Sequence, residues 1–178
     1  GCIGQINLME ACNAPTRILL DLESNSVGSN VNGKPNSLPF ESRSVDVAIL
    51  PHTLDFSHSP HEVLREVQRV LSPEGHIVLI GFNPLSAWGL RHLISRRQDQ
   101  VPWDANFLAL SRIKDWLALL GFELTQGSMM YYRPPLQNQK ILDYLSFLDK
   151  LGNRWLPLMA AVYLVVAKKR TLGMTPLH

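Results

Sequence analysis

The chain has 178 residues, of which 46% are hydrophobic and 18% are charged, a composition that excludes intrinsic disorder and allows one domain with a full core. Two cysteines are too few for a disulfide framework or a cysteine zinc site, so we expect a reducing, cytoplasmic location. The longest apolar run, 156–167, is too short for a transmembrane helix, which needs about 20 residues. It therefore predicts a buried strand.

The net charge of +2 is unevenly distributed. Residues 1–84 hold 5 Lys/Arg and 9 Asp/Glu, whereas residues 85–178 hold 12 and 6. A basic half is compatible with an anionic substrate, RNA or lipid headgroups. A solvated surface is the favoured interpretation, and nothing clearly indicates a nucleic-acid partner.

The first half of the chain predicts two strands separated by a loop. Residues 16–22 form a short apolar run that ends in acids. Residues 24–37 are rich in Ser, Asn and Gly and predict a loop. Residues 45–50, VDVAIL, predict a strand because they are β-branched or aliphatic.

A helix is predicted next. Ser59 is a suitable N-cap, Pro60 suits the first helical position, and Glu62 completes a capping box. Apolar residues follow at helical spacing, and Pro73 and Gly75 are expected to stop the helix.

The rest of the chain continues the alternation of strands and helices. Strands are predicted over 76–82, 123–132 and 160–169, and helices over 85–97, 111–122 and 137–152. This order predicts an α/β fold with a mostly parallel sheet covered by helices on both faces. Ligands of such sheets bind beyond the carboxyl ends of the strands, which here are Asp21–Glu23, Pro51–Asp55 and Phe82–Ser86.

Three histidines, His52, His58 and His61, lie within eleven positions at one of these strand ends. Three imidazoles and a water can hold zinc, but no matching Cys, Asp or Glu spacing supports a metal site. His52 is the best placed to accept a proton from a substrate, with a packing role as the alternative. His58 and His61 are expected to be surface or cap residues.

Residues 38–84 contain a specific series of motifs: LPF, a strand with an internal Asp46, a helix reading L-x-E-x-x-R-V-L-x-P, and a further strand. The series resembles the class I S-adenosylmethionine-dependent methyltransferases of the type 11 group. Three segments, LPHTLDF, PHEVLRE and GFNPLSAWGLRHL, are similar to its YafS-like bacterial branch. The family has a glycine where this chain has Glu74.

This resemblance implies a Rossmann-like class I sheet with an antiparallel last strand and S-adenosyl-L-methionine as the cofactor. It assigns Gly1, Cys2 and Gly4 to the end of the glycine-rich cofactor loop, Asp21 to the ribose hydroxyls, and Leu22 to the cofactor-binding residues. Glu23 competes for that role, and a surface acid is the alternative for Asp21.

The resemblance also places Leu38 and Pro39 along the adenine, and Pro51 and His52 beside the methionine part and the methyl group. Lys34 stands where the family often has an aspartate that binds the adenine amine, a bond that lysine cannot accept.

The remaining candidates belong to the methyl acceptor. Asp55, a second candidate base, and Asn83, Ser86 and Trp88 are expected to line its pocket, with a core position as the alternative for Trp88. The acceptor is expected to be a small molecule, and neither its identity nor the oligomeric state follows from the sequence.

The resemblance implies that the first strand of the class I sheet would precede Gly1. We therefore expect residues 1–170 to form a single N-terminally truncated methyltransferase-like domain, followed by a tail at 171–178.

Two alternatives to an active methyltransferase stay open. The first is a degenerate member of the fold that acts by partner binding without catalysis, for which Lys34 and the incomplete glycine loop argue. The second is a nicotinamide-dependent Rossmann enzyme, which is disfavoured because the chain has no G-x-G-x-x-G motif.

Overall fold

A computed structural model describes residues 15, 16, 18, 20–21, 31–86, 88–90, 105–130 and 160–170, with only the backbone of Asp21. The predicted glycine loop (Gly1, Cys2, Gly4), Leu22, Glu23 and the predicted helix 137–152 lie outside these residues. Within the described part of the chain, every helix is too short or too polar to cross a membrane.

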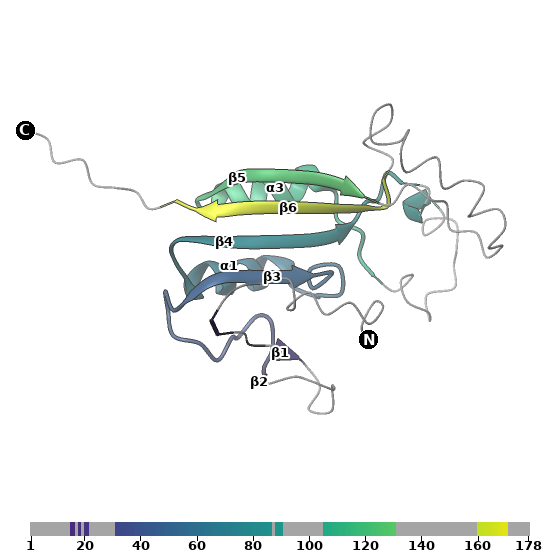
Figure 1. Cartoon of the computed structure of the whole chain (residues 1–178). Helices are drawn as coiled ribbons and strands as arrows, with labels where there is room; N and C mark the ends of the chain where they lie inside the picture. The colour runs from purple at the N-terminus through teal and green to yellow at the C-terminus, as the bar shows by residue number, and fades with distance from the viewer. Residues whose placement is uncertain are drawn as a thin grey trace, which may run out of the picture.

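The centre of the molecule is a four-stranded sheet with the order β3-β4-β6-β5 (Figure 1). Its strands are β3 (Val45–Pro51), β4 (Leu71–Phe82), β5 (Phe122–Met130) and β6 (Val162–Lys169). Strands β3 and β4 pair in parallel, and β6 lies antiparallel between β4 and β5. The prediction of a mostly parallel sheet with an antiparallel last strand is confirmed.

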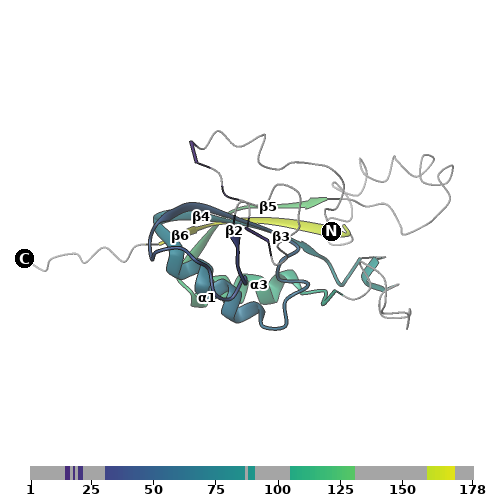
Figure 2. The ribbon, with the colours of Figure 1, turned by 90° about the horizontal axis from the view of Figure 1, so that it is seen from below.

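Two helices cover one face of this sheet, α1 (Pro60–Val70) and α3 (Leu110–Leu119), as Figure 2 shows. The helices bury Val63, Leu64 and Val67 of α1 and Ile113 and Leu117 of α3, which are at most 3% exposed. Alternate strand residues meet them from the sheet, and together they form the core: Leu50, Ile77, Leu79, Tyr163, Val165 and Ala167. Burial of this apolar surface is the main stabilising contribution to the fold.

The opposite face of the sheet is also apolar. Val47 and Ile49 of β3 are 46% and 40% exposed. Both belong to the set of side chains that alternates with the core set along the strand. The described helices therefore confirm the predicted helical cover for one face of the sheet.

The start of α1 differs from the prediction in its capping. Ser59 is the N-cap and Pro60 the first helical residue, as predicted, but Ser59 makes no side-chain capping bond. Glu62 instead accepts a hydrogen bond of 3.2 Å from the side-chain amide of Asn36. The predicted capping box is wrong because this acid is drawn toward the segment before β3.

The end of α1 also differs. The helix ends at Val70, and the chain enters β4 directly at Leu71, five residues earlier than predicted. The pairing of Val45 with Leu71 is followed by that of Val47 with His76, so residues 72–75 bulge out of the ladder. The backbone of Glu74 in this bulge has a φ of 64°, which explains why the resembled family has glycine there.

A separate pair of short strands precedes the main sheet. Strand β1 (Leu20–Asp21) is shorter than the predicted strand 16–22 and pairs in parallel with β2 (Val31–Asn32). The prediction of an unbroken loop over 24–37 is therefore wrong at β2, where backbone hydrogen bonding overrides a turn-rich composition.

Gly81 of β4 lies against the buried ring of Tyr163 on the neighbouring strand. A Cβ at Gly81 would lie 2.4 Å from the hydroxyl oxygen of Tyr163, which is 1% exposed and cannot move aside. We expect Gly81→Ala to lower the free energy of unfolding by about 1–3 kcal/mol, measured by urea denaturation. Gly127→Ala is the matched control, because a Cβ there meets nothing closer than 4.0 Å. Equal stability of the two variants would contradict this packing.

Glu74 permits a second stability test. A left-handed backbone costs a residue with a Cβ about 1–2 kcal/mol. We therefore expect Glu74→Gly to be more stable than Glu74→Ala by about 1 kcal/mol in urea, since both lose the same ion pair to Lys168. An alanine variant as stable as the glycine variant would show that this bulge is not strained.

Candidate active site

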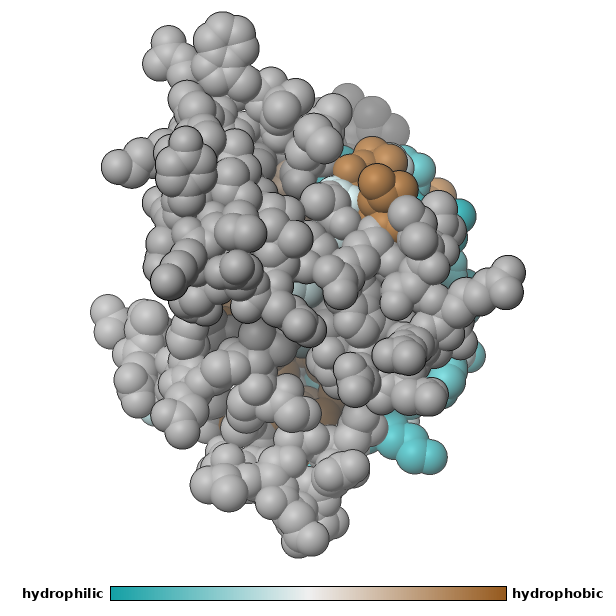
Figure 3. All heavy atoms as spheres, turned by 90° about the vertical axis from the view of Figure 1, so that its right-hand side faces the viewer, coloured by the Kyte–Doolittle hydropathy of each residue, from teal (hydrophilic) through white to brown (hydrophobic). Residues whose placement is uncertain are grey.

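The carboxyl ends of β3 and β4 lie side by side at one edge of the sheet, at the right of Figure 1. Figure 3 looks onto this side of the molecule, where apolar atoms are exposed among the described residues. Large apolar side chains are exposed in the segments that follow the two strands, namely Phe56 after β3 and Leu85 and Leu90 after β4. This edge combines apolar surface with buried polar groups, the usual composition of a ligand site.

A sharp turn places His52 directly after β3. Its φ of 54° is left-handed, which is uncommon outside glycine and asparagine, and its N–H donates to the carbonyl of Ile80 at 2.8 Å. The side chain of His52 is 11% exposed, and its imidazole stacks on Phe82 with ring centroids 4.1 Å apart. Backbone and ring contacts therefore both hold His52 against the end of β4.

The side chain of Asp55 contacts His52 and is fully buried, with 0% exposure. Its Oδ2 lies 2.9 Å from Nδ1 of His52 and accepts the N–H of Phe82 at 3.0 Å. Within the described structure no donor reaches Oδ1. Burial raises the pKa of this carboxyl, and the hydrogen bonds from His52 and Phe82 oppose that rise.

The structure thus brings together two residues that the sequence had placed in different roles. His52 was a candidate base beside the methyl group, and Asp55 a pocket residue and weaker base. They form one hydrogen-bonded pair. The signal in the sequence was only their i, i+3 spacing after a strand, which does not reveal the reversal of the chain at His52.

The segment after β4 uses its polar side chains locally. Asn83 donates to the carbonyl of Ala160 at 2.9 Å and accepts the N–H of Leu85 at 3.1 Å. The Ser86 hydroxyl donates to the carbonyl of Asn83 and accepts the N–H of Gly89, at the start of a helical turn over 88–90. These bonds give both side chains a structural role. A role of Asn83, Ser86 or half-buried Trp88 in an acceptor pocket stays a prediction.

The LPF segment before β3 is fastened by two residues of α1 that sequence reasoning passed over. Glu66 accepts the N–H of Leu38 at 2.9 Å. Arg69 donates to the carbonyls of Leu38 and Phe40 at 3.2 and 3.0 Å and to both oxygens of Glu66. The Glu and Arg of the L-x-E-x-x-R motif are therefore a clamp on LPF. This clamp occupies both backbone polar groups of Leu38, which leaves its side chain for apolar contact.

Gly33 joins this segment to β1. A Cβ on Gly33 would lie 3.0 Å from Cδ of Pro39 and 3.2 Å from Cδ1 of Leu20. Leu20 of β1 and Pro39 therefore both lie beside Gly33, and the ribose role of Asp21 and the adenine role of Pro39 stay predictions. Lys34 is exposed and forms a bridge with Ser37.

The three histidines that follow β3, His52, His58 and His61, have separate surroundings. His52 pairs with Asp55, the ring of His61 contacts Trp116 with centroids 3.7 Å apart, and His58 is exposed. No group of three or more His, Cys, Asp or Glu side chains suited to a metal ion occurs in the part of the chain that the structure describes.

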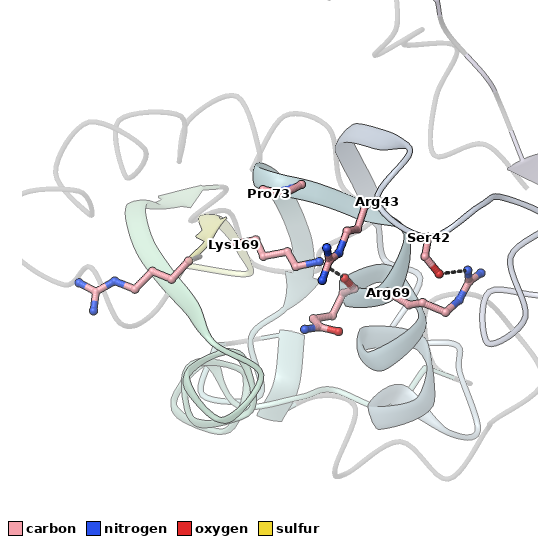
Figure 4. Close-up of a pocket in the computed structure, with 7 residues that line it drawn as sticks. Ser42, Arg43, Arg69, Pro73 and Lys169 are labelled. Carbon is pink, nitrogen blue, oxygen red and sulfur yellow. Dashed lines mark hydrogen bonds between the residues drawn. The ribbon is translucent and has the colours of Figure 1, made fainter. Parts of the chain in front are cut away.

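A second polar site lies at the opposite, amino-terminal edge of the sheet. This cleft of about 510 Å³ is lined by basic residues, and Figure 4 shows Arg43 and Lys169 pointing toward one another. The ammonium of Lys169 donates to the carbonyls of Gln68 and Leu71 at the end of α1. These bonds make Lys169 a cap for the free carbonyls of that helix.

Comparison with known proteins agrees with this geometry. Residues 12–79 match the family model described as a methyltransferase domain. These residues are thus similar to the methyltransferase family. Over 166 residues the chain is 36% identical to the uncharacterized protein YafS of Escherichia coli K12, covering 93% of this chain and 65% of that protein. The chain thus spans 65% of the length of this curated relative.

Solved structures show the fold. An S-adenosylmethionine-dependent methyltransferase of Thermotoga maritima superposes with a TM-score of 0.58 at 18% identity, covering 81% of this chain and 65% of that one. One from Mesorhizobium loti gives 0.57 at 17% identity, with 84% and 78% covered. The predicted Rossmann-like class I fold is confirmed.

The clamp on LPF generates a pH-dependent prediction. Hydrogen bonds from Arg69 hold the pKa of Glu66 below its ordinary 4.5, so the clamp stabilises the fold fully above that pH and loses strength as the pH falls through the lowered value. We expect Glu66→Gln to unfold at a lower temperature at pH 7 and to lose less stability on acidification. Thermal melts from pH 7 to 3 measure both effects.

The matched control for the clamp is Glu41→Gln. Glu41 is an exposed acid whose side chain forms no hydrogen bond with another described residue. Its melts should coincide with those of the wild type. An unchanged Glu66→Gln profile would show that Arg69 alone fastens the segment.

Proposed function

We propose that the protein is an S-adenosylmethionine-dependent methyltransferase that acts on a small-molecule acceptor at the carboxyl edge of β3 and β4. The observation that carries the proposal is the buried His52–Asp55 pair, because a polar pair of this kind occupies the ligand-binding edge of a methyltransferase fold. When bound, the cofactor supplies a methyl group on a sulfonium, whose carbon–sulfur bond breaks with its electron pair left on sulfur as the methyl joins the acceptor.

The residues of this chain would hold the cofactor along the edge. The side chains of Leu38 and Pro39 offer apolar contact for the adenine, and the Glu66–Arg69 clamp keeps them in place. Asp21 at the end of β1 is assigned to the ribose hydroxyls, which a carboxylate accepts well. Pro51 ends β3 and His52 follows it, and both would lie on the methyl side, while Gly1, Cys2 and Gly4 would supply the end of the glycine loop.

The acceptor would bind beyond His52. The rings of His52, Phe82 and Phe107 form a stack there, with centroids 4.1 and 5.0 Å apart. The exposed apolar side chains of Phe56 and Leu85 extend this surface. Alignment of the acceptor with the methyl group supplies much of the catalysis in such a site. A cytoplasmic location and a single domain over 1–170 remain part of this proposal.

The first test is calorimetric titration of S-adenosylhomocysteine into the full-length protein. We expect binding in the micromolar range that weakens at least tenfold in Asp21→Ala, a loss of about 1.4 kcal/mol. Asp115→Ala, which removes an exposed acid on α3, is the matched control and should bind as the wild type does. Absence of binding at millimolar ligand would favour instead a degenerate domain that acts through a partner.

A further inference from the structure

The candidate site contains a carboxyl group that the methyl transfer itself does not need. Asp55 is fully buried and cannot reach a substrate without passing His52 or the end of β4. A buried, ionisable side chain destabilises a fold unless it is well paired, so its presence at this edge requires an explanation. Its only side-chain partner among the described residues is His52.

We propose that Asp55 is a positioning residue that makes His52 the proton acceptor, and that the acceptor substrate reacts through a hydroxyl or an ammonium group. The inference rests on the proposed function. It goes beyond it by fixing the tautomer of His52 and the chemical class of the acceptor.

The tautomer follows from the hydrogen bonds at Asp55. Oδ2 already accepts the N–H of Phe82, and an ionised carboxylate can only accept. Both hydrogen bonds at Oδ2 favour the carboxylate form of Asp55, and in this form Nδ1 of His52 carries a proton and donates it across the 2.9 Å contact. A neutral imidazole with its proton on Nδ1 has a free lone pair on Nε2, and Nε2 forms no hydrogen bond with any described residue.

The backbone conformation of His52 and two contacts, one of its N–H and one of its ring, fix the direction of that lone pair. The left-handed backbone at His52 turns its side chain toward β4, and its N–H is tied to the carbonyl of Ile80. Phe82 stacks on one face of the imidazole. The ring therefore has one orientation, with Nδ1 directed to the buried carboxylate and Nε2 on the opposite side of the ring.

The acceptor class follows from the proton. A hydroxyl group holds its proton at neutral pH and must lose it as the oxygen gains the methyl group. An ammonium group must lose one proton before it reacts, because only the freed lone pair of nitrogen can form the bond to the methyl carbon. In both cases the proton moves to Nε2 and leaves His52 as an imidazolium, whose Nδ1–H stays bonded to the Asp55 carboxylate, and the proton then passes to solvent. An acceptor that reacts through a free lone pair without losing a proton would not need His52 as a proton acceptor or Asp55 to position it.

The tautomer can be measured without knowing the acceptor. In the full-length protein labelled with ¹⁵N-histidine, the imidazole nitrogen shifts show which atom is protonated, and loss of the signals in His52→Asn assigns them. Asparagine is chosen because it tolerates the left-handed backbone. We expect a proton on Nδ1 in the wild type. In Asp55→Leu, which removes the acceptor that faces Nδ1 and the N–H of Phe82, we expect the proton on Nε2, the tautomer that an unconstrained imidazole prefers. A wild-type proton on Nε2, or no change in a folded Asp55→Leu protein, would overturn the proposal.

A second measurement needs no variant and therefore holds even if Asp55→Leu does not fold. Diethyl pyrocarbonate modifies the free lone pair of neutral histidines, and peptide mapping identifies the sites. We expect His52 to react and S-adenosylhomocysteine to slow that reaction at least fivefold, while exposed His58 reacts equally with and without ligand. Unreactive His52 beside reactive His58 would overturn the proposal, and so would ligand that binds in calorimetry without protecting His52.

The two measurements separate the failure of the inference from the failure of the proposed function. If S-adenosylhomocysteine does not bind, the methyltransferase assignment fails, and the nitrogen shifts still decide whether Asp55 sets the tautomer of His52. If the ligand binds and His52 carries its proton on Nε2, the methyltransferase proposal is supported and the proton-acceptor role of His52 and Asp55 is refuted.

Discussion

The buried carboxylate of Asp55 holds the candidate site together, because it links three segments of the chain. Its side chain binds the imidazole of His52 and the N–H of Phe82, and its carbonyl accepts the N–H of Asn106 at 2.6 Å. The turn after β3, the end of β4 and the segment before α3 therefore meet at one residue. Buried hydrogen bonds of this kind are stronger than exposed ones and specify a single arrangement.

The L-x-E-x-x-R motif of α1 has two structural roles. Its apolar positions, among them Leu64 and Val67, fill the core beneath the sheet. Its charged positions, Glu66 and Arg69, bind the backbone of the LPF segment. A single helix therefore stabilises the sheet with one face and fixes the LPF segment with another, which explains why LPF and L-x-E-x-x-R occur in the same series.

Much of the fold could be predicted from local sequence. Residues 45–50 and 160–169 are β-branched and aliphatic, and both form strands of the central sheet. The site edge also followed from topology, since parallel strands bring their carboxyl ends together. The capping box failed because Asn36, 26 positions away, binds Glu62. Such long-range side-chain contacts have no local signature.

The composition of the site was predicted better than its geometry. His52 and Asp55 were both singled out, but the hydrogen bond between them depends on a φ of 54° that histidine seldom adopts. Sequence patterns report the backbone conformations that each residue type prefers. They therefore cannot identify a residue whose neighbours hold it in a conformation that it seldom adopts. The clamp residues Glu66 and Arg69 were missed for a different reason. Charged positions on an amphipathic helix are usually solvated, and only the structure shows their contacts with LPF.

Two unfavourable features coincide in the four residues from His52 to Asp55. The left-handed backbone at His52 costs about 1–2 kcal/mol. Asp55 is buried with one oxygen that no described donor reaches, and this desolvation raises its pKa. Apolar residues in an ordinary turn would pack more stably. Strained conformations that do not increase stability occur most often at functional sites, where the surrounding structure holds them in place. The sheet edge, the Phe82 stack and the bond to Ile80 provide that support here. Arg43, His52 and Glu74 are the described non-glycine residues with a left-handed backbone, and of these only His52 lies at the carboxyl edge of the sheet, where the fold positions the chemistry.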